Sequence, residues 1–587
     1  MAVLIKEVKV LNFRSCKETS LVLRPYTALI GYNNAGKSNI ILAINWLLDG
    51  YFIADDDLFD TTNPVIVEAS VIGIDEDALS LISEENRTKL EKFIDDGVLN
   101  FRRIQEKDTN GKVKKSIQLK QGGEWKKNPG GIDGAISNIF PEPIHIPAMS
   151  DAVEDATKSK SSTTIGKLLS LIVAEIKKEH ETKFNAAIME IDKFLSYNGH
   201  DRLNGLNDID NDLNAKINEF FHDVNVKLHF PTPSLEDIFK SGTLKIFEKS
   251  SCGETMRDIS KFGHGTQRSI QMALIQYLAD RKQSSIGRKK SNTLIFIDEP
   301  ELYLHPSAIH AIRDSLVLLS RAGFQVIITT HSASMISYKH AADAVQVYKD
   351  ATLGTISRRT LSEKIEELYQ ASSAQLYSAF TLNNASQILF SEEVFLVEGK
   401  TEINVLPAIY NRFKGRNLDL SKKAFVSVNG KGSIFGMAEV ISAVGIKTRV
   451  LVDCDFLGIY FNHPTTKDKI IKEKEEFELS LKKALESNEL ILKKPFKSLK
   501  CLKSYSSEDF LMLCECKSMQ PILYAIHDKL KSEGIFFWKL GDIECVYGVK
   551  KSHAGWEQLT VDLQDEQKDI QTIIKNHEHM AEFVDWL

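Results

Sequence analysis

A glycine-rich loop near the N-terminus constrains the fold more than any other feature of this sequence. Residues 31–38, GYNNAGKS, match the pattern G-x-x-x-x-G-K-[ST] and lie between a predicted strand at 26–30 and a predicted helix at 39–48. Such a loop turns its backbone N–H groups onto phosphate oxygens at a helix N-terminus. Its lysine reaches the β- and γ-phosphates, and its serine hydroxyl binds Mg²⁺. The residues predicted to bind a nucleoside triphosphate are Gly31, Asn33, Asn34, Gly36, Lys37 and Ser38.

Two later segments complete this predicted nucleotide site. The apolar run at 294–297 predicts a strand buried on both faces, and it ends in Asp298 and Glu299. Asp298 suits Mg²⁺ binding, either directly or through another ligand, and Glu299 suits polarisation of an attacking water. A second apolar strand at 324–330 ends beside His331, where an imidazole could sense the γ-phosphate. A lone histidine is usually only packed or solvated, but its position after this strand favours a functional role.

Acidic residues also end two strands in the last third of the chain. Glu398 follows a predicted strand at 394–397, with Glu402 four residues on, and Asp453 and Asp455 follow a strand at 449–452. Because the carboxyl ends of parallel strands meet at one edge of a sheet, Glu398, Asp453 and Asp455 are expected to converge. Clustered carboxylates repel each other unless a divalent cation offsets their charge, and oxygen ligands favour Mg²⁺ or Mn²⁺. The pattern therefore predicts a metal site, with Glu402 as a further candidate ligand.

Composition narrows the classes of protein that remain. The chain has 587 residues, 43% of them hydrophobic, which is enough for several globular domains. Its net charge of −6 excludes binding to nucleic acid by bulk charge, although it permits a local basic groove. The seven cysteines are scattered, and we find neither a signal peptide nor a long apolar run. We therefore expect a cytoplasmic protein with reduced thiols and no membrane partner.

The order of the glycine loop, the Asp-Glu strand end and the histidine resembles an ABC-type ATPase of the kind found in DNA-repair and chromosome-maintenance proteins. Such ATPases carry a glycine-rich signature before the Asp-Glu strand, and residues 262–268, FGHGTQR, occupy that place with Gly263 and Gly265. The segment departs from the transporter form, because His264 replaces the first of two paired glycines. The resemblance implies that this segment contacts the ATP of a partner protomer, so that two copies enclose two nucleotides.

The acidic strand ends resemble the Toprim domain of topoisomerases, primases and certain nucleases. In addition, residues 538–544, WKLGDIE, are similar to a late motif of the overcoming-lysogenisation-defect (OLD) nucleases. In that family the motif supplies a carboxylate to a second metal, and an essential lysine follows it. The match assigns Asp542 and Glu544 to the acidic positions and leaves both Lys550 and Lys551 open as the lysine. A competing acidic patch at 506–509 has a helix N-cap as its plainer interpretation.

An ABC-type ATPase followed by Toprim is the layout of the OLD family, and the resemblance covers nearly the whole chain. The predicted fold is α/β, with an N-terminal ABC-type ATPase domain that contains a helical dimerisation insertion, followed by a C-terminal Toprim α/β domain. The insertion contains a long helix predicted over 165–196. The predicted boundaries are 1–148 for the first ATPase part, 149–235 for the helical insertion, 236–350 for the second ATPase part, 351–390 for a helical connector and 391–587 for Toprim.

The resemblance implies an ATP-regulated, Mg²⁺-dependent DNA endonuclease, with Mn²⁺ as the alternative ion. Glu398 would bind metal and activate water, Asp453, Asp455 and Glu544 would bind metal, and a lysine near 550 would offset charge on the phosphate. The alternative is a non-cleaving ABC-type DNA-repair ATPase whose Toprim domain only binds DNA. A topoisomerase or primase is less favoured, because the chain leaves little room for a domain that carries a tyrosine nucleophile.

The same resemblance implies partners and a biological setting. The OLD family includes the nuclease subunit of Gabija and nucleases encoded beside retrons, so an antiphage role in a bacterium or phage is implied. It also implies a homodimer or a larger even-numbered oligomer, and either a helicase partner or a reverse transcriptase with its RNA–DNA product. The lysine-rich segment 467–503, with Phe477 and Phe496 interleaved, could track a DNA backbone. A solvated helical face of mixed charge explains that segment equally well.

Overall fold

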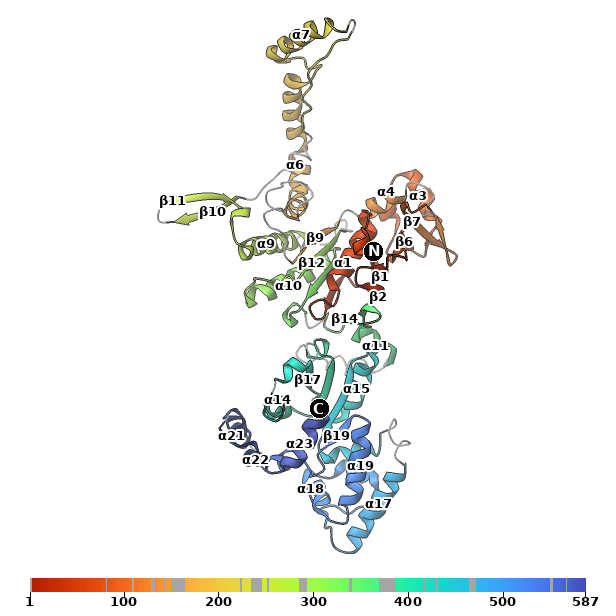
Figure 1. The fold of residues 1–587 in the computed structure, drawn as a ribbon, viewed down its shortest axis with the longest axis vertical. Coiled ribbons are helices and arrows are strands. Elements are labelled where there is room, and N and C mark those ends of the chain that lie inside the picture. The colour runs from red at the N-terminus through yellow and green to blue at the C-terminus, as the bar shows by residue number, and fades with distance from the viewer. Residues whose placement is uncertain are drawn as a thin grey trace. The chain divides into compact units, whose positions relative to one another are not determined.

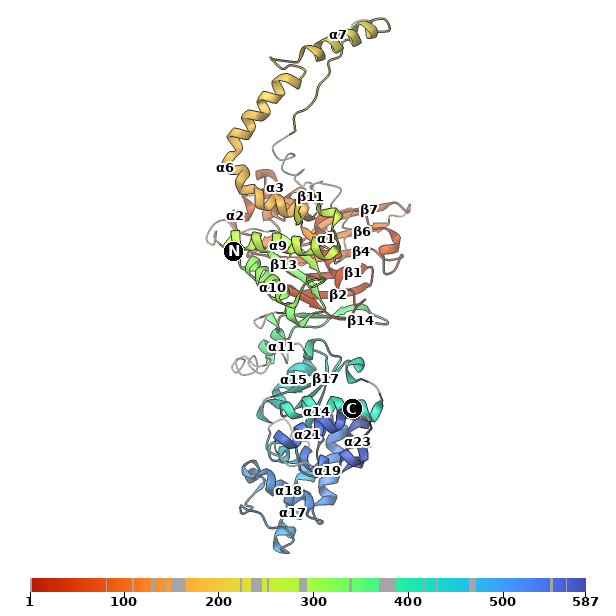
Figure 2. The same cartoon turned by 90° about the vertical axis from the view of Figure 1, so that its left-hand side faces the viewer.

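The computed structural model divides into two compact units, which are described separately below (Figure 1, Figure 2). Unit 1 comprises Met1–Leu29, Asn33–Ser337 and Tyr348–Ile356, and unit 2 comprises Ile30–Tyr32, Tyr338–Val347 and Ser357–Leu587. The structure describes residues 3–80, 82–107, 110–127, 132–140, 143–148, 164–221, 224–233, 245–250, 253–283, 293–336, 340–368, 387–415, 417–428, 431–463, 471–548, 553–565 and 567–587.

One large mixed sheet provides most of the strands of unit 1. Its strands are β1 (Leu4–Phe13), β2 (Cys16–Val22), β3 (Tyr26–Ile30), β4 (Val65–Ile72), β5 (Ile94–Asp95), β6 (Val98–Lys107), β7 (Val113–Gln121), β8 (Glu124–Lys127), β9 (Ile144–Ile146), β12 (Leu294–Asp298), β13 (Gln325–Thr330), β14 (Val345–Asp350) and β15 (Gly354–Ser357). Their order is β8-β7-β6-β4-β1-β2-β15-β14-β3-β13-β12-β9, and β5 pairs with β6. A separate hairpin pairs β10 (Lys245–Ser250) with β11 (Gly253–Asp258).

The two halves of this sheet differ in how their strands are buried. At one end β1, β2, β4, β6, β7 and β8 pair antiparallel, and β4 alternates between buried and partly buried residues. At the other end β12 runs parallel to β9 and β13, and every residue of β3, β12 and β13 is buried. Buried parallel strands read as continuous apolar runs, which is why the sequence predicted β12 and β13. Their carboxyl ends carry the glycine loop, Asp298 and His331.

Helices cover this sheet and extend from it. They are α1 (Lys37–Asp49), α2 (Glu76–Leu79), α3 (Glu84–Glu91), α4 (Ile132–Ile139), α6 (Thr164–Leu195), α7 (Asn204–Asn218), α9 (His264–Gln283) and α10 (Pro306–Arg321). Helix α1 contacts β1, β4 and β13, and α9 contacts α10. Helix α6 corresponds to the long helix predicted over 165–196 and contacts β9 and α9, and α7 follows it (Figure 1).

Unit 2 contains a four-stranded parallel sheet. Its order is β17-β16-β18-β19, from β16 (Glu393–Val397), β17 (Lys423–Ser427), β18 (Lys447–Val452) and β19 (Ile535–Phe537). Strand β16 lies between β17 and β18, and all three pairings are parallel. Because Leu396 pairs with Val450, the residues after β16 and β18 leave the sheet at the same edge. That edge carries the acidic residues singled out in the sequence.

Helices surround the sheet of unit 2. They are α11 (Leu361–Leu368), α14 (Lys400–Lys414), α15 (Ile434–Ala443), α16 (Leu457–Tyr460), α17 (Ile471–Glu486), α18 (Ser507–Glu515), α19 (Gln520–Ser532), α20 (Ile543–Tyr547), α21 (His553–Gln564), α22 (Ile570–Ile573) and α23 (His577–Trp586). Phe395, Trp538 and Phe583 belong to one buried cluster that joins the sheet to the C-terminal helix. Among the described residues, we find no helix with the length and hydrophobicity that a membrane crossing requires.

The structure favours one of the two interpretations of the lysine-rich segment. Phe477 of α17 has an exposed fraction of 0% and packs on Phe461, with ring centroids 5.1 Å apart, so it cannot stack on a nucleic acid base. Lys482 of the same helix pairs with Glu478 on the preceding turn. Helix α17 therefore matches the alternative interpretation, a packed helix with a solvated face of mixed charge.

Candidate nucleotide and metal sites

The glycine loop adopts a backbone that requires glycine. Gly36 has φ of 101° and directly precedes α1, and Gly31 has φ of 150°. A Cβ atom on Gly36 would lie 2.0 Å from Thr355 Oγ1, so any larger residue would clash as well as strain the backbone. Asn34 also has a positive φ, 64°, a conformation that asparagine tolerates better than most residues. The loop thus ends at the N-terminus of a helix, where backbone N–H groups are available to an anion.

Asp298 and Ser38 lie together, as their predicted shared role requires. Ser38 Oγ donates to Asp298 Oδ1 at 2.9 Å, and Thr329 Oγ1 donates to the same oxygen at 2.8 Å. His145 Nε2 lies 3.1 Å from Asp298 Oδ2. Burial alone would raise the pKa of Asp298, but the hydrogen bonds from His145, Thr329 and Ser38 outweigh it and lower that pKa. The sequence did not identify His145 as a partner of Asp298, because the pairing of β9 with β12 brings them together.

Lys37, His331 and Glu299 form a second group around the same loop. Lys37 Nζ lies 2.9 Å from His331 Nε2, and that nitrogen lies 3.4 Å from Glu299 Oε1. Burial lowers the pKa of Lys37 to about 8, although the nearby carboxylates oppose the shift. Burial and the charge of Lys37 lower the pKa of His331. At neutral pH the histidine is therefore uncharged and can accept a hydrogen bond from the ammonium group.

The signature segment lies at the start of α9. Gly263 precedes the helix and Gly265 is its second residue, with Tyr303 Cβ 3.8 Å from where a Cβ on Gly265 would be. His264 stacks on the ring of Tyr303 at 6.3 Å. Whether Gly263 and Gly265 contact a partner's nucleotide stays a prediction, because these contacts are all within one protomer.

Three carboxylates converge at the edge of the unit 2 sheet. One oxygen from each of Glu398, Asp453 and Asp455 lies within 4.8 Å of the other two. The Asp453 backbone N–H donates to Glu398 Oε1 at 3.2 Å, which ties the end of β16 to the end of β18. The parallel register of these two strands produces the convergence that their sequence positions predicted.

The late motif packs against this acidic edge through its backbone. The Cys454 N–H, between the two aspartates, donates to the Gly541 carbonyl at 2.7 Å. The Asp542 carboxylate accepts from the Cys545 N–H at 3.0 Å and so caps α20, and its predicted role as a metal ligand stays a prediction. In the other acidic patch, Asp509 forms a capping box with Ser506, which supports the plainer interpretation of that patch. Lys550 and Lys551 lie outside the described residues.

Glu402 and Glu544 form a further acidic pair near Tyr547. Each glutamate is buried, with an exposed fraction of 8%. Burial, followed by the charges of Glu402 and Glu544, raises the pKa of Tyr547. A Cβ on Gly399 would lie 3.3 Å from Glu402 Oε2, so the glycine after Glu398 leaves room for this side chain. Neither glutamate belongs to the three-carboxylate cluster found among the described residues.

Comparison with known proteins identifies a family domain over each of the two regions that carry the glycine loop and the three-carboxylate cluster. Residues 4–121 and 99–336 match a family model described as AAA ATPase domain, and residues 389–455 match the overcoming lysogenization defect protein-like TOPRIM domain. The Old nuclease of Escherichia phage P2 is 59% identical over 591 residues, with 100% of both chains covered. This chain belongs to the OLD nuclease family. The predicted family and the predicted α/β fold, an ATPase domain followed by Toprim, are therefore confirmed.

Solved structures of Smc heads also align with this OLD nuclease. The Smc head domain from Pyrococcus furiosus, with an extended coiled coil and bound to the C-terminal domain of ScpA, covers 63% of this chain and 99% of its own, at 16% identity and a TM-score of 0.37. The SMC head domain from Thermotoga maritima covers 60% of this chain and 97% of its own, at 14% identity and a TM-score of 0.29. Likenesses at these TM-scores carry no conclusion about this chain.

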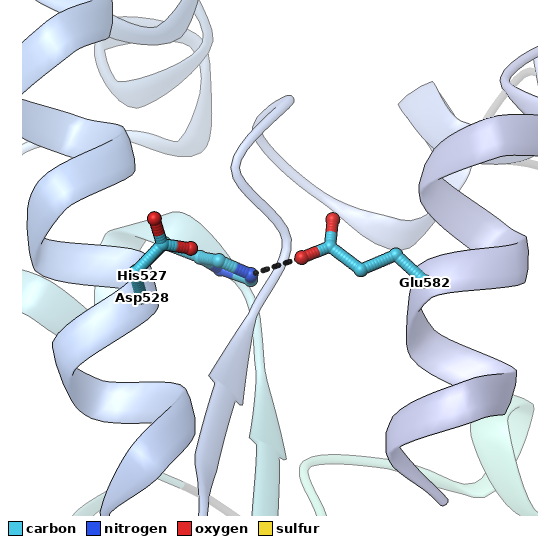
Figure 3. Close-up of side chains that lie close together, drawn as sticks. All are labelled: His527, Asp528 and Glu582. Atoms are coloured by element: carbon cyan, nitrogen blue, oxygen red, sulfur yellow. Dashed lines mark ion pairs between the residues drawn. The ribbon is translucent and has the colours of Figure 1, made fainter.

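A third group of titratable side chains in the OLD chain does not suit a cation. His527 of α19 faces Glu582 of α23, with Nε2 and Oε1 3.4 Å apart, and Asp528 lies beside them (Figure 3). However, Lys531 Nζ and Lys539 Nζ each lie 2.7 Å from a Glu582 oxygen. Two ammonium groups already offset this carboxylate, so a metal ion would face strong repulsion. The cluster is an ion-pair network that ties α19 and α23 to the loop leading to Glu544.

Proposed function

We propose that this OLD nuclease is a DNA endonuclease that hydrolyses phosphodiester bonds with Mg²⁺, under the control of ATP bound at the glycine loop. The observation that carries the proposal is the convergence of Glu398, Asp453 and Asp455, whose oxygens lie within 4.8 Å of one another. Carboxylates this close repel each other, and a divalent cation offsets that repulsion. Mn²⁺ also prefers oxygen ligands and is the alternative ion.

The donor set fits a hard divalent ion, because each of its three members is a carboxylate. When bound, such ions stabilise the attacking and leaving oxygens of an in-line displacement at phosphorus. We assign metal binding to Asp453 and Asp455, and both metal binding and water activation to Glu398. The hydrogen bond from the Asp453 N–H to Glu398 Oε1 supports this assignment, because it orients the glutamate carboxylate at the edge of the sheet.

A second metal ion would bind at the late motif, residues 538–544. We assign Glu544 and Glu402 as its ligands, with Asp542 as a further candidate, because both glutamates are buried and the charges of both act on the same tyrosine, Tyr547. One of Lys550 and Lys551 would offset charge on the phosphate during the reaction.

The ATP part of the proposal rests on contacts around the glycine loop. Lys37 would bind the β- and γ-phosphates, and the hydrogen-bonded pair of Ser38 and Asp298 would hold Mg²⁺. Glu299 would polarise the attacking water, with His331 beside it to respond to the γ-phosphate. Gly263 and Gly265 would contact the nucleotide of a partner protomer.

The assembly and biological role follow from the same proposal. Exposed apolar side chains on and after α7, including Phe220 and Phe221 with exposed fractions of 79% and 66%, support a homodimer or larger even-numbered oligomer formed through the helical insertion. DNA is the proposed substrate, and an antiphage role of the Gabija or retron-associated kind is the proposed setting. A neighbouring helicase gene would favour the former, and a neighbouring reverse transcriptase gene the latter.

Removal of one carboxylate tests the nuclease proposal. We expect Glu398→Ala and Asp455→Asn each to reduce cleavage of plasmid DNA in Mg²⁺ by at least ~100-fold, because loss of a ligand displaces the ion from the scissile phosphate. ATP binding, measured with a fluorescent analogue, should stay within about twofold of the unchanged protein, because these residues lie in the other unit.

Glu476→Gln is the matched control, because it removes a partly exposed carboxylate of α17 in the same unit. It should leave both activities unchanged. Full cleavage by Glu398→Ala would remove the assignment, whereas equal losses in Glu476→Gln would show that the assay responds to net charge alone.

A further inference from the structure

Arg268, the last residue of the signature segment 262–268, is buried within its own protomer. Its exposed fraction is 4%, although the family resemblance places this segment at the nucleotide of a partner. Its Nη2 donates to the Asp298 carbonyl at 2.6 Å and to the Glu299 carbonyl at 2.9 Å. Its Nη1 donates to the Pro147 carbonyl at 3.2 Å and lies 3.4 Å from Gln271 Oε1. Three of these four acceptors are backbone carbonyls, two at the end of β12 and one after β9.

The backbone that Arg268 contacts is in an unusual conformation. Glu299 has φ of 47°, in the left-handed region that non-glycine residues seldom adopt. On the other side of the same peptide, the Glu299 N–H donates to the Thr329 carbonyl at 2.9 Å. Two neighbouring strands and one arginine therefore hold this conformation, and a strained residue persists only where its surroundings fix it.

The consequence of this conformation is the direction of the Glu299 side chain. The carboxylate lies 3.4 Å from His331 Nε2, which in turn lies 2.9 Å from Lys37 Nζ. If Glu299 relaxed to an ordinary extended or helical φ, its side chain would leave this group. Glu299 directly follows the last residue of β12, so rotation of the single peptide between Asp298 and Glu299 is enough to move its side chain away.

We propose that Arg268 is a positioning residue for ATP hydrolysis, which holds the Asp298–Glu299 peptide so that the Glu299 carboxylate faces the attacking water. This inference rests on the proposed ATPase role of Glu299. Arg268 acts through the backbone, since its Nη1 and Nη2 donate to carbonyl oxygens of its own protomer. Burial lowers the pKa of Arg268 to about 10, which still leaves the group charged at neutral pH.

Lysine cannot replace this arginine. A single guanidinium spans three carbonyls with fixed planar geometry, whereas an ammonium group is a point charge at the end of a flexible chain. Arg268→Lys therefore retains the charge and loses the geometry. Arg268→Gln provides a second variant that buries no charge and retains one NH₂ donor.

The test is the steady-state ATPase activity of the full chain. For both variants we expect kcat to fall by roughly 10- to 100-fold, the range typical of lost orientation in an active site, with KM within about twofold of the unchanged protein. Glu299→Gln should show a comparable loss. The double variant Arg268→Lys with Glu299→Gln should be no slower than Glu299→Gln alone, because residues that act through one group are not additive.

Ser269→Ala is the matched control on the same helix, where the exposed hydroxyl donates only to the Gly265 carbonyl. It should retain kcat, and thermal unfolding should show that all variants fold. An unchanged kcat in both arginine variants, a raised KM with normal kcat, or a further multiplicative loss in the double variant would each overturn the inference. Absence of ATP hydrolysis by the unchanged protein would instead contradict the ATPase part of the proposed function, and Arg268 would lose its role with it.

Discussion

Neighbouring residues can have different roles when their surroundings differ, and Asp298 and Glu299 illustrate this at the scale of single residues. Asp298 accepts hydrogen bonds from Ser38 and Thr329, which, together with His145, keep its pKa low despite burial. A carboxylate held charged in this way suits a cation. Glu299 points elsewhere because its backbone is left-handed, and it faces a histidine. The sequence predicted both roles from the positions of the two residues after the strand. Only the structure shows how the left-handed backbone of Glu299 turns the two carboxylates in different directions.

Tyr547 offers a test of the second acidic pair. Its hydroxyl is buried and has no hydrogen-bond partner among the described residues, and the charges of Glu402 and Glu544 act on it. Tyr547→Phe removes an unsatisfied group, so the metal-free protein should be as stable as before or more stable by up to ~1 kcal/mol. If these glutamates bind an ion, we expect the hydroxyl to donate to one of them in the metal-bound protein, and the Mg²⁺ concentration for half-maximal DNA cleavage should rise about 10-fold in the variant.

Stability and the Mg²⁺ requirement, measured together, distinguish a role of Tyr547 in metal binding from a role in packing alone. Tyr460→Phe is the control, because its hydroxyl is directed at Glu533 instead. An unchanged Mg²⁺ requirement in Tyr547→Phe would argue that Glu402 and Glu544 do not hold an ion. A loss of stability without a change in the metal requirement would mean that the hydroxyl has only a structural contact.

At the scale of elements, the sequence predicted best where one local pattern determines the outcome. Strand β12 is an unbroken apolar run, and its prediction needed no knowledge of its neighbours. The sequence did not predict the contact of His145 with Asp298, because that contact depends on which strands pair. The sequence left two interpretations of Phe477 open, and the structure favours the packed helix with a solvated face, because Phe477, Leu481 and Ala484 form its buried face.

The ion-pair network around α23 makes the stability of this part of the protein depend on pH. Burial, then the charge of Lys539, lowers the pKa of His579 to about 4, and Glu582 and His527 are its other charged neighbours. The unfolded chain binds this proton below pH ~6.5, whereas the folded chain resists it until about pH 4. The contribution of neutral His579 to the free energy of unfolding is therefore complete above pH ~6.5. It declines as the pH falls toward 4, by about 3 kcal/mol at most.

His579→Gln should remove most of this decline. We expect the urea midpoint of unit 2 to fall less between pH 7 and pH 5 in this variant than in the unchanged protein. Met580→Leu, a buried neighbour that does not titrate, should shift the midpoint equally at both pH values. A decline of equal size in His579→Gln would assign the pH dependence to other groups.

At the scale of the whole molecule, Lys37 and Glu398 lie in different units of one chain, which makes the proposed ATP control testable. Lys37→Ala should weaken ATP binding by about 100-fold, because it removes the proposed charged contact with the phosphates. It should leave metal-dependent DNA cleavage intact in the absence of ATP, and cleavage should no longer respond to added ATP. Glu398→Ala should show the reverse, with ATP binding kept and cleavage lost. The test measures ATP affinity, and DNA cleavage with and without ATP, in both variants. Normal ATP affinity in Lys37→Ala would contradict the nucleotide site. A response of cleavage to ATP that survives the loss of ATP binding would contradict control through that site.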